Sequence, residues 1–259
     1  MPVKRIVAHN QFIKTFYFAH RLKAKPGQFV WLWLPQVAEK PFSVGWQTES
    51  EFGLTICQVG PATQKMFQLK VGDKVGIKGP YGTHYDVRQA KNIALVGGGY
   101  GSAPLSFLAE TELNKNPLLN IDFIIGAQAK NLIFIRPQDF NQKIIYHFTT
   151  NDGSQGEAGL ATDALERLLK KGNINYLATC GPELMQHKVV ELAVKYNVSC
   201  QISLERYMKC SHGICGQCVV DPLGIRMCTE GPVLDKELAL QISEFGLYHR
   251  GPAGERIDF

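Results

Sequence analysis

The sequence predicts three parts in order: an N-terminal antiparallel β barrel over residues 1–88, an α/β domain with a parallel sheet over residues 89–200, and a small cysteine-rich segment over residues 201–259. Three observations predict this division. Short apolar strands with glycine and proline turns fill the first part, strands alternate with helices in the second, and four spaced cysteines stand in the third. With 259 residues, of which 45% are hydrophobic, the chain can bury a core in both larger parts.

The barrel is predicted from closely spaced strands that are separated by turn residues. The pairs Pro26-Gly27, Gly72-Asp73 and Gly79-Pro80 fall between apolar runs, where tight turns are needed. We expect strands at residues 5–9, 12–20, 28–34, 42–47, 53–59 and 74–78, and a short helix at 63–69. Many short strands with such punctuation favour an antiparallel sheet that closes on itself.

From residue 92 the pattern changes to strand, helix, strand. We expect strands at residues 93–96, 121–125, 144–149 and 175–179, and helices at 103–113, 160–170 and 183–196. The strands are continuously apolar, which is typical of a parallel sheet covered by helices on both faces. The boundary between the barrel and this domain is expected at residues 87–91.

Four cysteines near the C-terminus have the spacing C-x4-C-x2-C-x9-C; they are Cys210, Cys215, Cys218 and Cys228. This spacing is typical of the thiolates that hold a 2Fe-2S cluster of the plant ferredoxin kind, and it predicts that the chain carries electrons. A structural zinc site is the main alternative, but zinc ribbons prefer two C-x2-C pairs and only one is present. Disulfides fit less well, because no signal-peptide pattern precedes residue 10.

A glycine-rich turn follows the first strand of the α/β domain and leads into a helix. Such a turn lets a pyrophosphate approach the backbone, although a tight turn without a ligand is the simpler alternative. Cys180 ends a later strand at the same edge of the sheet, where it would face a nicotinamide as the candidate catalytic residue or be only a buried thiol. The candidate nicotinamide-binding residues are Gly97, Gly98, Gly99, Gly101, Pro104, Gly181 and Pro182.

Composition excludes several classes of function. The net charge of +5 is modest, and no basic stripe or motif indicates a nucleic-acid partner. No stretch approaches the roughly 18 apolar residues of a membrane span, so no membrane association is expected. Seven cysteines without an export signal suggest the reducing cytoplasm.

Several motifs, taken in order, resemble the ferredoxin-NADP reductase superfamily. Lys40-Pro41-Phe42-Ser43 is similar to its R-P-F-S flavin motif, with Lys40 giving a point charge where arginine gives a fork. The segment from Gln58 to Thr63 is similar to the second flavin motif, G-x-G-T, and Gly79-Pro80-Tyr81-Gly82 to the end of the barrel. The resemblance implies FAD in the barrel, with flavin-binding residues Lys40, Pro41, Phe42, Ser43, Gln58, Val59, Gly60, Ala62 and Thr63.

Within that superfamily, the chain resembles the electron-transfer subunit of NAD-dependent dihydroorotate dehydrogenases. The run from Ser203 to Cys210 is similar to the S-L-E-x-x-M-x-C-G segment of that subunit, except that Ser211 stands for the glycine. The resemblance implies electron transfer between NAD(H), FAD and a 2Fe-2S cluster, to or from a dihydroorotate dehydrogenase catalytic subunit in a heterotetramer of two copies each. A hydrogenase, sulfide dehydrogenase or ferredoxin:NADP oxidoreductase subunit, and a redox sensor, remain alternatives.

Overall fold

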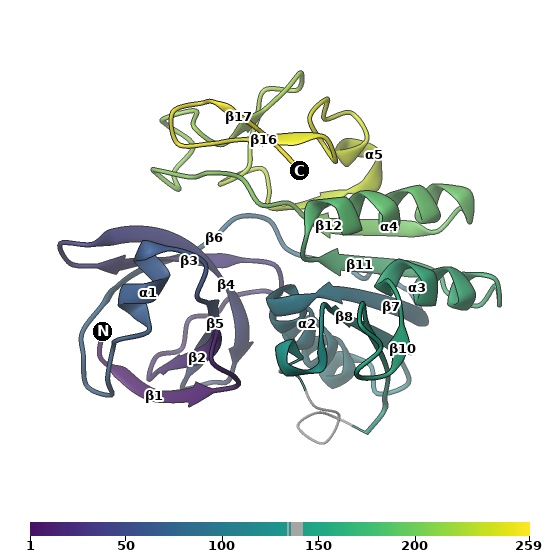
Figure 1. The fold of residues 1–259 in the computed structure, drawn as a ribbon, viewed down its shortest axis with the longest axis horizontal. Helices are drawn as coiled ribbons and strands as arrows, with labels where there is room; N and C mark the ends of the chain where they lie inside the picture. The colour runs from purple at the N-terminus through teal and green to yellow at the C-terminus, as the bar shows by residue number, and fades with distance from the viewer. Residues whose placement is uncertain (134, 136–141) are drawn as a thin grey trace.

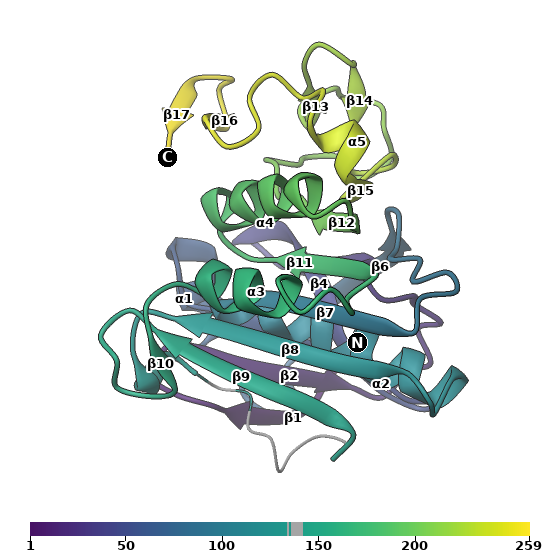
Figure 2. The same ribbon diagram turned by 90° about the vertical axis from the view of Figure 1, so that its right-hand side faces the viewer.

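The structure, a computed structural model, describes residues 1–133, 135 and 142–259. Figures 1 and 2 show the barrel beside the α/β domain, with the cysteine-rich segment above the sheet of that domain. In the described part of the chain no helix is long and apolar enough to cross a membrane. The antiparallel and the parallel sheet that the sequence predicts are both present.

The first sheet has six antiparallel strands in the order β1-β2-β5-β4-β3-β6. Backbone contacts between β1 and the chain before β6, including the bridge from Pro2 to Lys74, close this sheet into a barrel. Its interior holds large side chains such as Phe16, Phe18 and Phe52, whereas Trp31 on β3 faces the core shared with the rest of the chain. The strands are β1 (Val3–Ala8), β2 (Ile13–Phe18), β3 (Phe29–Leu34), β4 (Ala38–Gln47), β5 (Phe52–Cys57) and β6 (Gly76–Tyr81), and helix α1 (Pro61–Met66) follows β5.

The second sheet has seven strands in the order β10-β9-β8-β7-β11-β12-β15, and all neighbours are parallel except β12 and β15. Its strands are β7 (Asn92–Gly98), β8 (Asn120–Ala127), β9 (Ile144–Thr150), β10 (Glu157–Ala158), β11 (Tyr176–Cys180), β12 (Ser199–Ser203) and β15 (Val233–Asp235). The short turns η1 (Gly99–Gly101) and η2 (Lys130–Leu132) follow β7 and β8. This alternation confirms the strands and helices predicted for the α/β domain.

Helices cover both faces of this sheet, as continuously apolar strands require. Helix α2 (Ser102–Lys115) packs on one face, where Leu105 and Leu108 join the core under β7 and β8. Helices α3 (Ala161–Leu169) and α4 (Glu183–Lys195) pack on the other face. Helix α2 also lies against β4 of the barrel, so it joins the two domains.

The sheet continues past residue 200, which the sequence pattern did not predict. Strand β12 pairs with β11, and β15 returns from the cysteine-rich segment to pair antiparallel with β12. The cysteine-containing chain between these two strands, residues 204–232, is therefore anchored on the sheet edge at both ends. Its other elements are β13 (Val219–Val220), β14 (Ile225–Arg226), α5 (Lys236–Ala239), β16 (Tyr248–Arg250) and β17 (Arg256–Asp258), the last two forming a hairpin. The domain boundaries that the sequence predicts, between residues 88 and 89 and between residues 200 and 201, remain predictions.

Candidate cofactor cavity and cluster loop

One large cavity lies between the barrel, the α/β domain and the start of the cysteine-rich segment. Its volume is about 1060 Å³, and its lining comes from β4, the chain around α1, the turn after β7, the end of β11 and the chain after β12. This volume is at the upper end of the range for small-molecule sites, so the cavity has room for a large cofactor. Three parts of the chain thus share one binding space.

The barrel wall contains most of the residues that resemble flavin motifs. Lys40, Pro41, Phe42 and Ser43 lie on β4 and all line the cavity, as do Val59, Gly60, Ala62 and Thr63 near α1. Gln58 does not line it. The Thr63 hydroxyl accepts hydrogen bonds from the N–H groups of Val59, at 2.9 Å, and Gly60, at 3.0 Å, and so fixes the turn before α1.

Lys40 lines the cavity and contacts an aromatic ring. Its Nζ lies 5.0 Å from the centre of the Tyr207 ring, a cation–π contact between the barrel and the chain that leads to the cysteines. A lysine makes this contact as a point charge and keeps its other donors available for a phosphate.

The edge of the parallel sheet forms the second wall. Gly101, Pro104 and Cys180 line the cavity, together with Tyr100. Gly97, Gly98, Gly99, Gly181 and Pro182 lie behind this wall and do not line the cavity. A Cβ on Gly101 would lie 2.5 Å from the Cys180 carbonyl oxygen, so the turn after β7 packs backbone to backbone against the end of β11.

Cys180 is a buried thiol that faces the cavity. Burial raises its pKa to about 12, so the thiol is protonated across the physiological range. We expect NADH-driven reduction of the flavin to show no pH inflection between 7 and 10 that depends on Cys180. Rates of wild type and Cys180→Ser, measured across that range by stopped-flow absorbance, should therefore change in parallel; an inflection near 8.5 that Cys180→Ser removes would show an ionising thiol.

The third wall was not predicted as a site, although its residues belong to the S-L-E segment. Ser203, Leu204, Glu205 and Met208 line the cavity next to Tyr100 and Cys180. Enclosure by the cavity walls raises the pKa of the Glu205 carboxyl, and the charge of Glu183 raises it further. The charge of Glu205 in turn raises the pKa of Tyr100. Other lining residues that sequence reasoning did not select include Phe29, Thr55, Cys57, Gln64, Lys65, Gln68 and Arg206.

The four cysteines of the spaced motif come together in two pairs. The Cys210 sulfur accepts from the backbone N–H of Cys215, from those of His212 and Ile214, and from the Cys215 thiol, and these contacts lower the pKa of Cys210 to about 6. The Cys218 and Cys228 thiols form the second pair, and the Cys228 N–H lies 3.4 Å from the Cys218 sulfur. In the described chain no three potential ligands surround one point. In a 2Fe-2S cluster each iron takes two thiolates, which is the pairing that Cys210 with Cys215 and Cys218 with Cys228 would provide.

Ser211 occupies a backbone conformation that favours glycine. Its φ is +60°, it is buried, and its Oγ donates to the Cys210 carbonyl at 2.5 Å. An L-residue in this region is strained by about 1–2 kcal/mol, which explains the glycine in the motif that this segment resembles. We expect Ser211→Gly to raise the Tm of the cluster-loaded protein by a few degrees and Ser211→Val to lower it. A lower Tm for Ser211→Gly would mean that the Oγ hydrogen bond outweighs the strain.

Comparison with known proteins agrees with this geometry. Residues 205–238 match the iron-sulfur cluster binding domain of dihydroorotate dehydrogenase B. A protein of Methanocaldococcus jannaschii is 41% identical over 98% of this chain and 96% of its own length, and one of Methanothermobacter thermautotrophicus is 38% identical over 99% and 96%. Both are named probable dihydroorotate dehydrogenase B (NAD⁺), electron transfer subunit.

Solved structures show the same architecture. A chain of an NADH-dependent reduced ferredoxin-NADP oxidoreductase, studied for flavin-based electron bifurcation, has a TM-score of 0.84 at 25% identity and covers 93% of this chain and 89% of its own. The ferredoxin reductase of carbazole 1,9a-dioxygenase has a TM-score of 0.68 at 18% identity, over 76% of this chain and 65% of its own, which concerns the fold alone.

The fold and the cavity define a ferredoxin reductase-like oxidoreductase that carries an additional cysteine-rich segment. The chain belongs to the family of dihydroorotate dehydrogenase B electron transfer subunits. This confirms the family that the sequence motifs indicated, with its oxidoreductase class and its FAD, 2Fe-2S and NAD(H) cofactors.

Proposed function

We propose that this chain passes electrons between NAD(H) and a separate dihydroorotate dehydrogenase catalytic subunit, in pyrimidine biosynthesis, by way of FAD in the cavity and a 2Fe-2S cluster. One observation carries the proposal: a single cavity is bounded by the barrel motifs, by the glycine turn with Cys180, and by the chain that leads directly to the paired cysteines. The sites proposed for nicotinamide, flavin and cluster therefore all border the same space.

The residues present fit a flavin in the cavity. Pro41, Phe42 and Ser43 form an apolar wall with one hydroxyl, which suits an isoalloxazine ring. Lys40 and Lys65 line the same cavity and supply positive charge for the phosphates. A bound flavin supplies the conversion between the hydride of a nicotinamide and the single electrons of an iron-sulfur cluster.

The turn after β7 and the end of β11 fit a nicotinamide nucleotide. Gly99 is half-buried with open space at its Cβ position, and Gly101 lines the cavity, so this turn is where a pyrophosphate would approach the backbone; Cys180 would limit how deeply the ring enters the cavity. Because the pKa of Cys180 is raised, we assign it a role in shape and contact, without proton transfer. Pro182 begins the turn into α4 and holds the edge in place.

Each residue of the cysteine motif has a role in holding the cluster. Cys210 and Cys215 would ligate one iron, and Cys218 and Cys228 the other, with backbone N–H groups aimed at the sulfurs of Cys210 and Cys218. The loop is tied to the barrel, because the His212 ring lies 5.4 Å from the ring of Tyr81, which packs on the cavity residue Phe29. The cluster loop and the flavin wall are therefore connected by packed side chains.

The cluster loop also presents an apolar surface. Ile214 lies between the first two cysteines and is 85% exposed, and Cys215 beside it is exposed as well. We assign this surface to the catalytic subunit, in a heterotetramer of two copies of each chain, because the cluster must come close to the partner's redox centre. The free thiols elsewhere in the chain suit a location in the cytoplasm.

We expect Ile214→Asp to weaken binding of the catalytic subunit by about tenfold, because a charge replaces apolar contact in the interface. Leu118→Asp is a matched control: Leu118 is 88% exposed in the chain between α2 and β8, away from the cluster loop. Titration calorimetry with the purified catalytic subunit measures both, and iron content shows that the loop is intact. Equal affinity for Ile214→Asp and wild type would move the interface elsewhere.

The proposed function is tested by mixing the chain with the catalytic subunit under anaerobic conditions. Orotate-dependent oxidation of NADH by the mixture, and by neither component alone, is the expected result. Ferredoxin and polysulfide serve as alternative acceptors in parallel reactions. Rapid reduction of either one, without any orotate-dependent rate, would overturn the assignment of the partner.

A further inference from the structure

A buried arginine lies between the cavity and the cluster loop. Arg206 follows the cavity residue Glu205 and precedes Cys210 by four positions, and only 2% of its side chain is exposed. Burying a guanidinium costs free energy unless carboxylates and carbonyls surround it. The partners of Arg206 therefore indicate which segments it holds together.

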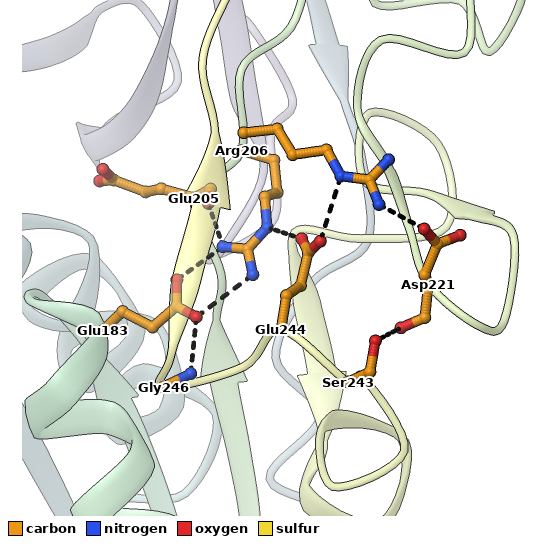
Figure 3. A network of polar contacts seen from close by, with 8 residues as sticks. Glu183, Glu205, Arg206, Asp221, Ser243, Glu244 and Gly246 are labelled. Atoms are coloured by element: carbon orange, nitrogen blue, oxygen red, sulfur yellow. Dashed lines mark hydrogen bonds and ion pairs between the residues drawn. The ribbon is translucent and has the colours of Figure 1, made fainter. Parts of the chain in front are cut away.

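The partners of Arg206 come from three separate segments (Figure 3). Its Nη1 and Nη2 donate to the two Glu183 carboxylate oxygens, at 2.6 and 3.2 Å, at the start of α4. Its Nε donates to Glu244 Oε1 at 2.7 Å, after α5, and Nη1 also donates to the Glu205 carbonyl at 2.8 Å. The Glu205 side chain points away from this network.

The network continues into the cluster segment and its C-terminal hairpin. Glu183 Oε1 accepts from the N–H of Gly246 at 3.0 Å, and Glu244 Oε2 lies 3.5 Å from Arg250 Nε. Arg250 also donates to the Asp221 carboxylate, in the turn after β13. The Glu244 carboxylate is fully buried and contacts both Arg206 and Arg250. Two guanidinium groups and three carboxylates, those of Glu183, Glu244 and Asp221, therefore form one connected network.

We propose that Arg206 is a positioning residue, which holds the cluster segment at a fixed distance and orientation from the flavin cavity. Glu183 is three residues after Cys180, so the network joins the nicotinamide edge, the cavity wall and both sides of the cluster segment. Because the rate of electron transfer falls steeply with distance, a loosened segment transfers electrons slowly even with an intact cluster. The inference rests on the proposed function, since it concerns electron transfer from flavin to cluster.

The test compares Arg206→Lys and Arg206→Gln with wild type, in full-length protein loaded with flavin and cluster. Stopped-flow absorbance after NADH addition separates flavin reduction from cluster reduction. We expect flavin reduction to change less than about twofold, and cluster reduction to slow about tenfold in Arg206→Gln, because small misplacements are costly. Arg206→Lys keeps the charge but not the fork, so an intermediate rate is expected.

Two further readouts separate positioning from simple loss of structure. The magnetic coupling between the flavin and the reduced cluster should weaken in Arg206→Gln, while the g-values of the cluster stay unchanged. Amide hydrogen exchange in residues 245–259 should become faster. Arg256→Gln is the matched control: Arg256 pairs with Asp258 in the same hairpin but lies outside the network, and it should behave as wild type.

Wild-type rates of cluster reduction in Arg206→Gln with full iron content would overturn the proposal. Equal slowing of the flavin and cluster steps would also overturn it, because that result indicates a general structural role. If Arg206→Gln does not fold, Arg250→Gln can replace it, because this variant removes only the contacts of Arg250 with Glu244 and Asp221. A wild-type rate of cluster reduction in Arg250→Gln would then overturn the proposal. Failure of the wild type itself to reduce its cluster with NADH would count against the proposed function instead.

Discussion

Replacing Cys228 by serine will remove the cluster and leave the nicotinamide chemistry intact. Cys228 is 1% exposed and pairs with Cys218, so its loss leaves one iron without a thiolate ligand in a buried position. We expect iron and acid-labile sulfide to fall below about a tenth of the wild-type content, and electron transfer to the catalytic subunit to fall by at least about a hundredfold. Reduction of the flavin by NADH should persist, because the cavity walls do not include Cys228.

The matched control for this substitution is Cys200→Ala. Cys200 is a buried thiol on β12, and burial raises its pKa to about 12, so it behaves as a small apolar side chain. Iron content should stay at the wild-type level in this variant. Retention of full iron and sulfide by Cys228→Ser, or stoichiometric zinc in the wild type, would show that the cysteine pairs have another purpose.

Adding one methyl group at Gly101 will impair nicotinamide binding. The φ of Gly101 is −62°, so alanine is compatible with its backbone conformation. The space is not available, because the new Cβ would lie 2.5 Å from the Cys180 carbonyl oxygen and 2.7 Å from the Gly181 nitrogen. The turn after β7 must then separate from the end of β11, which costs about 1–3 kcal/mol and corresponds to a rise in KM for NADH of roughly 5- to 150-fold.

Steady-state reduction of ferricyanide by NADH measures this effect without the catalytic subunit. Gly172→Ala is the control, because Gly172 lies beyond the end of α3 and has open space around its position. Its φ of +74° predicts a modest loss of stability and no change in KM. An unchanged KM in Gly101→Ala would mean that the nicotinamide does not use this edge.

Local sequence signals predicted the larger part of the fold. Short, closely spaced strands with glycine and proline turns identified the barrel, and continuous apolar strands alternating with helices identified the parallel sheet, because these patterns reflect local turn chemistry and burial. The cysteine spacing predicted a cluster loop, since a short loop with small residues can fold closely around a cluster. The glycine-rich turn was predicted because glycines between a strand and a helix let a pyrophosphate approach the backbone.

Contacts between distant segments were not predictable in this way. Strand β12 was missed because Ser199–Ser203 is short and polar, and its place in the sheet depends on β15, about thirty residues later. Tyr100 and Glu205 belonged to motifs, yet their meeting in the cavity follows from the packing of two domains. The partners of Arg206 lie 23 and 38 positions away, so no spacing rule indicates them.

The central claim is that paired electrons enter the cavity as a hydride and leave as single electrons through the cluster. The most direct measurement is an anaerobic titration of the purified chain with NADH, monitored by flavin absorbance and by electron paramagnetic resonance. The account predicts two irons and two acid-labile sulfides for each bound flavin, loss of flavin absorbance, and a reduced 2Fe-2S signal that grows with added NADH. Flavin that is reduced while the cluster stays oxidised at excess NADH would contradict it.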